Sequence, residues 1–109
     1  MLRLNTNRTF TVPVPVPYVD EEGKDQSGNF TTTFRVLPGT EAEHPDNAGK
    51  SLLGMVVVQI HDDLELYDKD GHKLEGDDLR TAAFADPSIA SAMISTYRAN
   101  VVKKPLPTT

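Results

Sequence analysis

The sequence predicts an α+β domain in which an N-terminal antiparallel β-hairpin packs on a small helical C-terminal half. Three observations support this fold class. Apolar and polar residues alternate in residues 8–37, as they do in strands with one buried face. Residues 48–104 are expected to be mainly helical, and residues 89–101 among them carry apolar side chains at helical spacing. The chain has 109 residues, which suits a single domain with one modest core.

The first strand is predicted by residues 10–18, where apolar residues alternate with Thr11 and the prolines Pro13, Pro15 and Pro17. Each proline fixes its own φ and keeps the valine before it out of the α region. Successive residues point their N–H groups to opposite edges, so the three missing donors lie along one edge. We expect an edge strand that is protected against unwanted pairing. The alternative is a polyproline ligand, although Val-Pro alternation does not give that class its usual spacing.

A polar turn is expected over residues 20–29, with Gly23 and Gly28 as turn residues, and a second strand over residues 30–36. Residues 38–50 have the composition of a loop. Residues 52–60 are apolar and β-branched, and periodicity does not decide between a buried strand and a buried helix over so short a run. An acidic stretch follows, in which Asp70-Gly71 predicts a turn.

Two helices are expected in the C-terminal part. A short one starts with Asp77 as its cap and ends before Pro87. A longer one starts at Asp86-Pro87, because Asp can cap free amides and Pro suits the first helical position. Pro105 ends it, after basic residues that the helix dipole favours, and residues 105–109 are expected to fray.

The longer helix carries an apolar stripe that we interpret as core, with a groove for a partner as the alternative. If the stripe borders an interaction surface, we expect that surface to lie along this helix and the open edge of the hairpin. The residues predicted to contact a partner are Met93, Tyr97, Val101 and Val102.

Composition excludes several classes of function. The net charge of -5 disfavours a nucleic-acid partner, because such affinity comes mainly from Lys and Arg. The chain has no cysteine, which excludes thiolate catalysis and Cys-based zinc sites. No apolar run approaches the length of a membrane span, and the first residues lack the apolar core of a secretory signal. We expect a cytoplasmic protein.

Two short segments resemble ligand-binding motifs, and each fails at a specific position. Ala48-Gly49-Lys50-Ser51 resembles the end of a phosphate-binding loop, but His44 stands where the first glycine of that loop is needed. Asp68–Gly71 resembles a calcium loop, but Leu66 then takes the place of the first ligand and Asp77 that of the final Glu. We expect no metal and no cofactor.

The three histidines, His44, His61 and His72, show no metal-ligand spacing. His61 beside Asp62 and Asp63 is a pair of a kind that small proteins commonly contain, and no nucleophile with a matching context accompanies it. We therefore expect a protein that is not an enzyme and that acts by offering surfaces to other proteins.

From Phe34 onward, the chain resembles the tail assembly chaperones of long-tailed bacteriophages. The resemblance depends on the order of the elements and on a few short segments. These are Phe34–Pro38, Leu52–Val58, the acidic turn Asp68–Gly71, the helix start Asp86–Ile89, and Tyr97–Asn100.

The resemblance implies a protein that binds tail proteins, notably the tape measure and the tail tube protein, during assembly in the host cytoplasm. It implies that the chain is absent from the finished particle, and that its C-terminal part is largely helical. That last point favours a helix over residues 52–60. The alternatives are a structural virion component, such as a head–tail joining or tail-terminator protein, and a small host regulatory adaptor.

Overall fold

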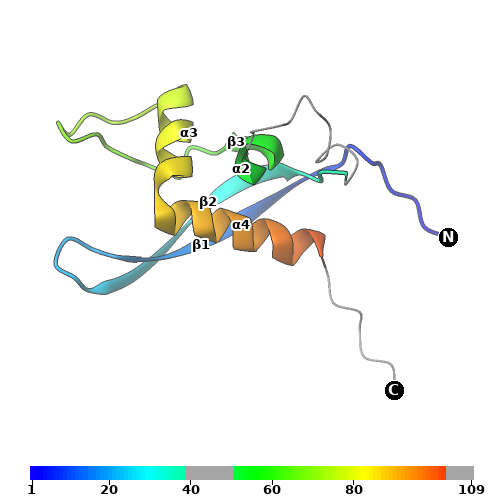
Figure 1. The fold of residues 1–109 in the computed structure, drawn as a ribbon, viewed down its shortest axis with the longest axis horizontal. Helices are drawn as coiled ribbons and strands as arrows, with labels where there is room; N and C mark the ends of the chain where they lie inside the picture. The colour runs from blue at the N-terminus through cyan, green and yellow to red at the C-terminus, as the bar shows by residue number, and fades with distance from the viewer. Residues whose placement is uncertain (39–50, 103–109) are drawn as a thin grey trace, which may run out of the picture.

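The computed structural model describes residues 1–38 and 51–102. Three antiparallel strands form a sheet in the order β1-β2-β3, and the helices lie toward the C-terminal end of the chain (Figure 1). The strands are β1 (Thr9–Val19), β2 (Asp25–Arg35) and β3 (Val57–Ile60), and the helices are α2 (Leu52–Val56), α3 (Gly76–Ala85) and α4 (Pro87–Val101). The predicted α+β class is confirmed. Within the described residues, no helix combines the length and apolar character needed to cross a membrane.

β1 lies at one edge of the sheet, as its prolines predict. Just before β1, the Arg8 carbonyl accepts a hydrogen bond from the Val36 amide at 3.0 Å. The backbone N–H and C=O groups of the even-numbered residues of β1 therefore point toward β2. Alternation then places the three prolines, all odd-numbered, along the other edge. The Val-Pro segment is therefore a paired strand rather than an isolated polyproline helix.

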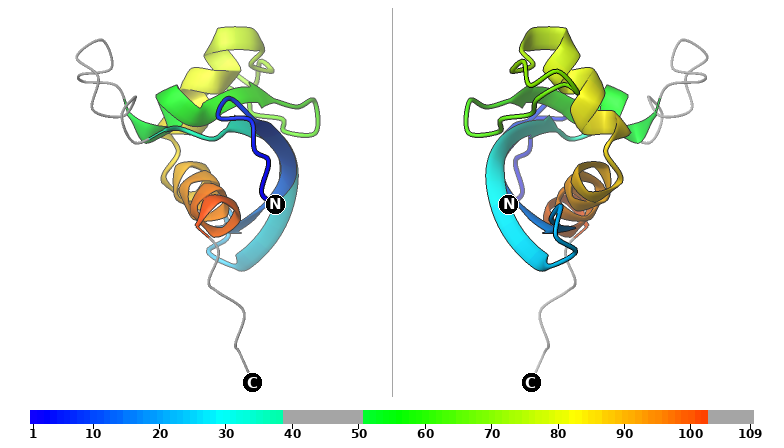
Figure 2. Two further views of the ribbon diagram at one scale, coloured as in Figure 1. Left: turned by 90° about the vertical axis from the view of Figure 1, so that its right-hand side faces the viewer. Right: turned by 90° about the vertical axis from the view of Figure 1, so that its left-hand side faces the viewer.

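The sheet is curved, and α4 lies on its concave side, as both views along this helix show (Figure 2). α4 begins where the sequence predicts. The Asp86 carboxylate accepts hydrogen bonds from the amides of Ser88 (2.9 Å) and Ile89 (3.1 Å), and Pro87 occupies the first helical turn. This cap satisfies two of the free amides in the first turn of α4.

The centre of the core is a cluster of three aromatic rings that joins β1, β2 and α4. The ring centroid of Phe34 lies 5.5 Å from that of Phe10 and 5.6 Å from that of Tyr97. The Tyr97 hydroxyl also accepts a hydrogen bond from the Leu37 amide at 3.1 Å. Around this cluster the buried apolar residues are Val14, Val16, Phe30, Leu53, Val56, Val57, Ala83, Ile89, Ala92 and Met93.

The segment 52–60, for which helix and strand were both open, contains one of each. The Ser51 hydroxyl accepts a hydrogen bond from the Gly54 amide at 3.1 Å and starts α2. β3 follows without a loop, with Val57 paired to Phe34. A helix over all of 52–60 is therefore wrong, because the β-branched residues from Val57 onward extend a sheet whose second strand has a free edge.

Two predicted boundaries also need correction. The turn after β1 is shorter than 20–29, because residues 25–29 continue β2 and Gly28 pairs with Val16. α3 starts at Gly76 with Glu75 in the cap position, and Asp77 lies inside the first turn, where the helix dipole favours its charge. Residues 39–50 of the predicted loop 38–50, with His44, lie outside the described residues. So do Lys103 and Lys104, predicted near the helix end, and the predicted tail 105–109.

Candidate functional site

The four residues predicted to contact a partner differ in exposure. Met93 and Tyr97 are buried in the core, with 0% and 6% of their surface exposed. Val101 is half-buried against the same core, and Val102, just after α4, is 74% exposed. The stripe on α4 is therefore core, in line with the first interpretation. Met93 and Tyr97 do not offer a surface to a partner, because the concave face of the sheet already covers them.

Two turns of the chain have the same structure. In the β1–β2 turn, the Asp20 carboxylate accepts hydrogen bonds from the amides of Glu22 and Lys24, both at 2.9 Å. In the acidic stretch, the Asp68 carboxylate accepts from the amides two and four residues later, again at 2.9 Å. Each turn has a glycine in the fourth position with positive φ, 79° at Gly23 and 84° at Gly71.

The second turn closes an arm, residues 64–74, in which Leu74 donates to the Leu66 carbonyl at 2.8 Å. The predicted turn at Asp70-Gly71 is thus confirmed. An aspartate that organises a tight turn through its carboxylate is a common device. In the β1–β2 turn this arrangement lowers the pKa of Asp20, chiefly because the Lys24 amide donates a hydrogen bond to the carboxylate.

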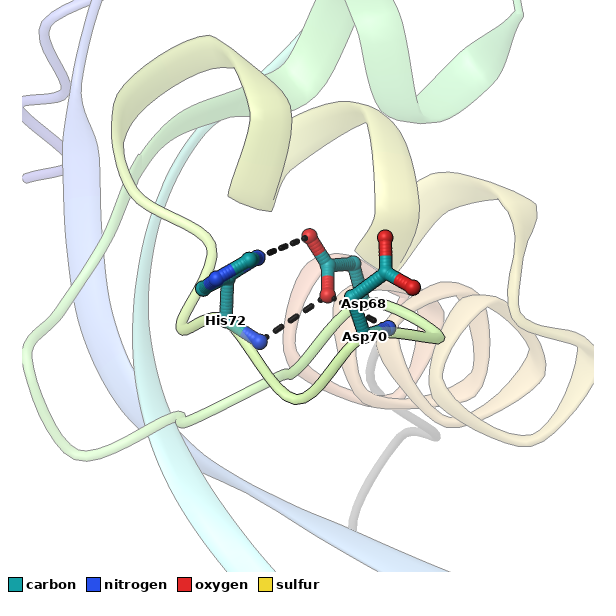
Figure 3. A group of neighbouring side chains, drawn as sticks. All are labelled: Asp68, Asp70 and His72. Carbon is teal, nitrogen blue, oxygen red and sulfur yellow. Dashed lines mark hydrogen bonds and ion pairs between the residues drawn. The ribbon is translucent and has the colours of Figure 1, made fainter.

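Turn geometry also gathers three possible metal ligands. Asp68, Asp70 and His72 each offer a ligand atom, and these atoms lie within 4.8 Å of one another (Figure 3). His72 Nδ1 lies 3.5 Å from Asp68 Oδ2. One Asp68 oxygen is already used by two amides, and the β1–β2 turn has the same shape with Glu22 and Lys24 in the corresponding places. The clustering therefore follows from the turn itself.

Calcium is expected to leave the stability of the protein unchanged. A ligand that binds the folded state raises its stability once its concentration exceeds the dissociation constant. We expect the same thermal midpoint in millimolar CaCl2 and in EDTA, measured by circular dichroism. A calcium-dependent rise that is lost in Asp70→Ser would contradict this prediction.

His61 bonds to a hydroxyl group on the convex face of the sheet. Its Nε2 lies 2.8 Å from Thr33 Oγ1, which in turn lies 2.7 Å from Thr11 Oγ1. A histidine beside a hydroxyl is also the arrangement of a base and a nucleophile. Here, however, the hydroxyl sits in a row of cross-strand bonds, and neither depression described below is lined by His61 or Thr33.

Asp63 fastens the root of the arm to β2. Its two carboxylate oxygens accept hydrogen bonds from the Thr31 amide at 2.9 Å and the Thr31 hydroxyl at 2.7 Å. The pKa of Asp63 is lowered, first by the bond from the Thr31 amide and then by the bond from its hydroxyl, because both bonds favour the charged form. This residue positions the arm relative to the hairpin.

We expect the stabilisation from Asp63 to depend on pH. The pKa of Asp63 is lower in the folded state than the value of about 3.9 for an unfolded Asp. Its carboxylate therefore stabilises the fold fully at pH values above about 3.9, and this contribution is lost as the pH falls through the folded-state pKa. Asp63→Asn should cost about 0.5–1 kcal/mol at neutral pH, a small value because the side chain is exposed. The difference from wild type, measured by urea unfolding, should shrink below about pH 4. Asp62→Asn is the control, and an equal effect there would contradict the prediction.

The arm and the hairpin together form a depression of about 450 Å³. It is lined by the ends of β1 and β2 near their turn, by residues 63–66 and by the first turn of α4. We call it the hairpin groove. The hairpin and the arm project to the same side of the molecule, with the α3–α4 junction between their bases (Figure 1).

Apolar and polar residues line the hairpin groove in about equal measure, and its floor is apolar. Val16, Phe30 and Ile89 contribute core side chains to its lining, and each is at most 8% exposed. Tyr18 and Val19, at the end of β1, are 43% and 62% exposed. Its polar lining includes three carboxylates, those of Asp63, Glu65 and Asp86.

A second depression lies on the other side of the arm, along β3 and α3. Val58, which is 51% exposed, and Glu75 belong to it, together with the basic residues Lys73 and Arg80. Arg80 is committed to the fold, because it donates to the Val57 carbonyl at 2.8 Å and lies over the Phe84 ring. The second depression is therefore mixed in charge, unlike the hairpin groove.

Comparisons with protein families, with curated proteins and with solved structures find no match to this chain.

Proposed function

We propose that this protein is a tail assembly chaperone of a long-tailed bacteriophage, which binds the tape measure and tail tube proteins transiently in the host cytoplasm. It acts by reversible protein binding and carries out no reaction. The proposal rests on the short segments shared with that class of protein and on the surfaces described above.

The resemblance depends on segments that are far apart in the sequence. The observation that carries this proposal is that three of these segments contact one another. Leu37 in the segment 34–38 donates to the hydroxyl of Tyr97 in the segment 97–100. Arg35 donates through Nε to the Met55 carbonyl at 2.7 Å, which ties the first segment to the segment 52–58. These bonds bring three of the five segments together in one packed unit.

The exposed surface also suits transient binding. Apolar side chains are open at Tyr18, Val19 and Val58, and carboxylates lie beside the first two. Small apolar contacts surrounded by charge give modest affinity, and the charged part of such binding weakens as salt screens it. An assembly chaperone needs this property, because it must cover a partner's adhesive surface and later leave it.

Co-purification with tail proteins tests the proposal. The tagged chain is expressed together with overlapping fragments of the tape measure protein and with the tail tube protein of the same phage. We expect at least one of them to co-purify at low salt and to dissociate as salt is raised. The matched control is the phage's portal protein, which should not be retained. Failure of all tail proteins to bind at micromolar concentrations would overturn the proposal.

A further inference from the structure

The hairpin groove is the surface of the described structure whose chemistry best defines a ligand. Its volume lies within the range of about 300–1,000 Å³ that holds small ligands, so it takes a few apolar side chains rather than a whole helix face. Tyr18 and Val19, both exposed at the end of β1, also line the groove. Covering their apolar surface removes it from water, which favours an apolar occupant.

The charges that line the groove all have one sign. Asp63, Glu65 and Asp86 contribute carboxylates, and none of the described residues that line the groove is a Lys or Arg. The first amides of α4 do not reverse this, because the Asp86 carboxylate already accepts from two of them. Lys73 Nζ lies 3.9 Å from Glu65 Oε1, and Lys73 lines the second depression instead.

We propose that the hairpin groove binds a segment of a partner protein in which apolar residues are flanked by Lys or Arg. The apolar side chains cover Tyr18 and Val19, and the basic side chains meet the carboxylates at the rim. This inference deepens the proposed function and rests on it, because it names the site and the chemistry of the tail-protein segment. A second copy of this chain is a poorer occupant, because a chain of net charge -5 is repelled by an acidic groove.

Two matched double variants test this site, one at each depression. Val19→Lys with Glu65→Lys places two cations at the hairpin groove. Val58→Lys with Glu75→Lys makes the same two changes of residue type at the second depression. All four side chains belong to exposed residues, so both variants are expected to keep the circular dichroism spectrum of the wild type.

The probe is a displayed library of random peptides of about a dozen residues, selected against the immobilised wild-type chain. We expect the selected peptides to be rich in Lys or Arg around Leu, Ile, Val or Phe. Synthetic copies should bind Val19→Lys/Glu65→Lys about tenfold or more weakly than wild type, and Val58→Lys/Glu75→Lys within about twofold of wild type. In NMR titrations, amide shifts should centre on residues 16, 18 and 19, on 63–66 and on 88–89.

The inference is overturned if the selection yields no saturable binder, if the selected peptides are acidic, or if the second double variant loses binding instead of the first. Failure of this inference and failure of the proposed function are distinguishable. If a tail protein binds the wild type and Val19→Lys/Glu65→Lys equally, the function stands and the site is wrong. If basic-apolar peptides bind the groove but no tail protein binds the chain, the site stands and the function is wrong.

Discussion

Phe34→Ala is expected to destabilise the protein by about 3–5 kcal/mol, the usual cost of deleting a large buried ring. Phe34 is completely buried, and its ring contacts those of Phe10 of β1 and Tyr97 of α4. The substitution removes one of the aromatic contacts between the sheet and α4 and leaves a cavity in its place. Because domains of this size are stable by only about 5–15 kcal/mol, a large share of the molecules should unfold under mild conditions.

Chemical denaturation with urea, followed by circular dichroism, measures this effect. Tyr67→Ala is the control, because Tyr67 is an aromatic residue in the arm with 57% of its surface exposed. Exposed substitutions of this kind usually change stability by less than about 0.5 kcal/mol. Equal losses in the two variants would mean that the aromatic cluster is not the centre of the core.

Thr32→Val is expected to have the opposite sign and to stabilise the protein by about 1–2 kcal/mol. Thr32 is completely buried among apolar residues on the concave face, and its hydroxyl has no hydrogen-bond partner. A buried hydroxyl without a partner has lost its bonds to water and gained none in return. Valine has nearly the same shape and removes this penalty, and it also has a higher β-propensity than most residues.

The same substitution one residue later should destabilise the protein. The hydroxyl of Thr33 points to the other face and bonds with Thr11 and His61. Thr33→Val therefore removes two cross-strand bonds and should cost about 1 kcal/mol. Thermal midpoints of the two variants should move in opposite directions, and a loss of stability in Thr32→Val would contradict this account of the core.

The parts of the fold that the sequence predicts well are those set by local chemistry. Pro13, Pro15 and Pro17 restrict the backbone whatever surrounds them, so an extended edge strand is predictable without tertiary information. Asp86 and Pro87 satisfy the requirements of a helix start through their own atoms, and α4 begins there. The turn at Asp70-Gly71 is predictable for the same reason.

The predictions that the structure corrects or decides concern segments whose structure depends on tertiary contacts. Residues 52–60 change from helix to strand at Val57, because the free edge of β2 is available to pair with the second half of the segment but not the first. The turn after β1 is short because the Asp20 carboxylate closes it, which allows polar residues 25–29 to continue β2. Composition alone favoured a longer loop there.

The candidate site was harder to predict than the fold. The residues of the hairpin groove come from three segments, residues 16–30, 63–66 and 86–89, whose proximity depends on the arm and on the Asp63–Thr31 bonds. The apolar stripe of α4 was the more visible feature in the sequence, but Met93 and Tyr97 lie in the core. Sequence periodicity identifies a buried face without saying what buries it.

We propose that this chain binds tail proteins during assembly and then leaves them. Quantitative mass spectrometry of assembly lysates and of purified particles from the same infection measures this most directly. We expect the chain in complexes with the tape measure protein before tails are complete, and its absence from finished particles. Stoichiometric amounts of the chain in the finished particle would contradict the account and identify a structural virion component instead.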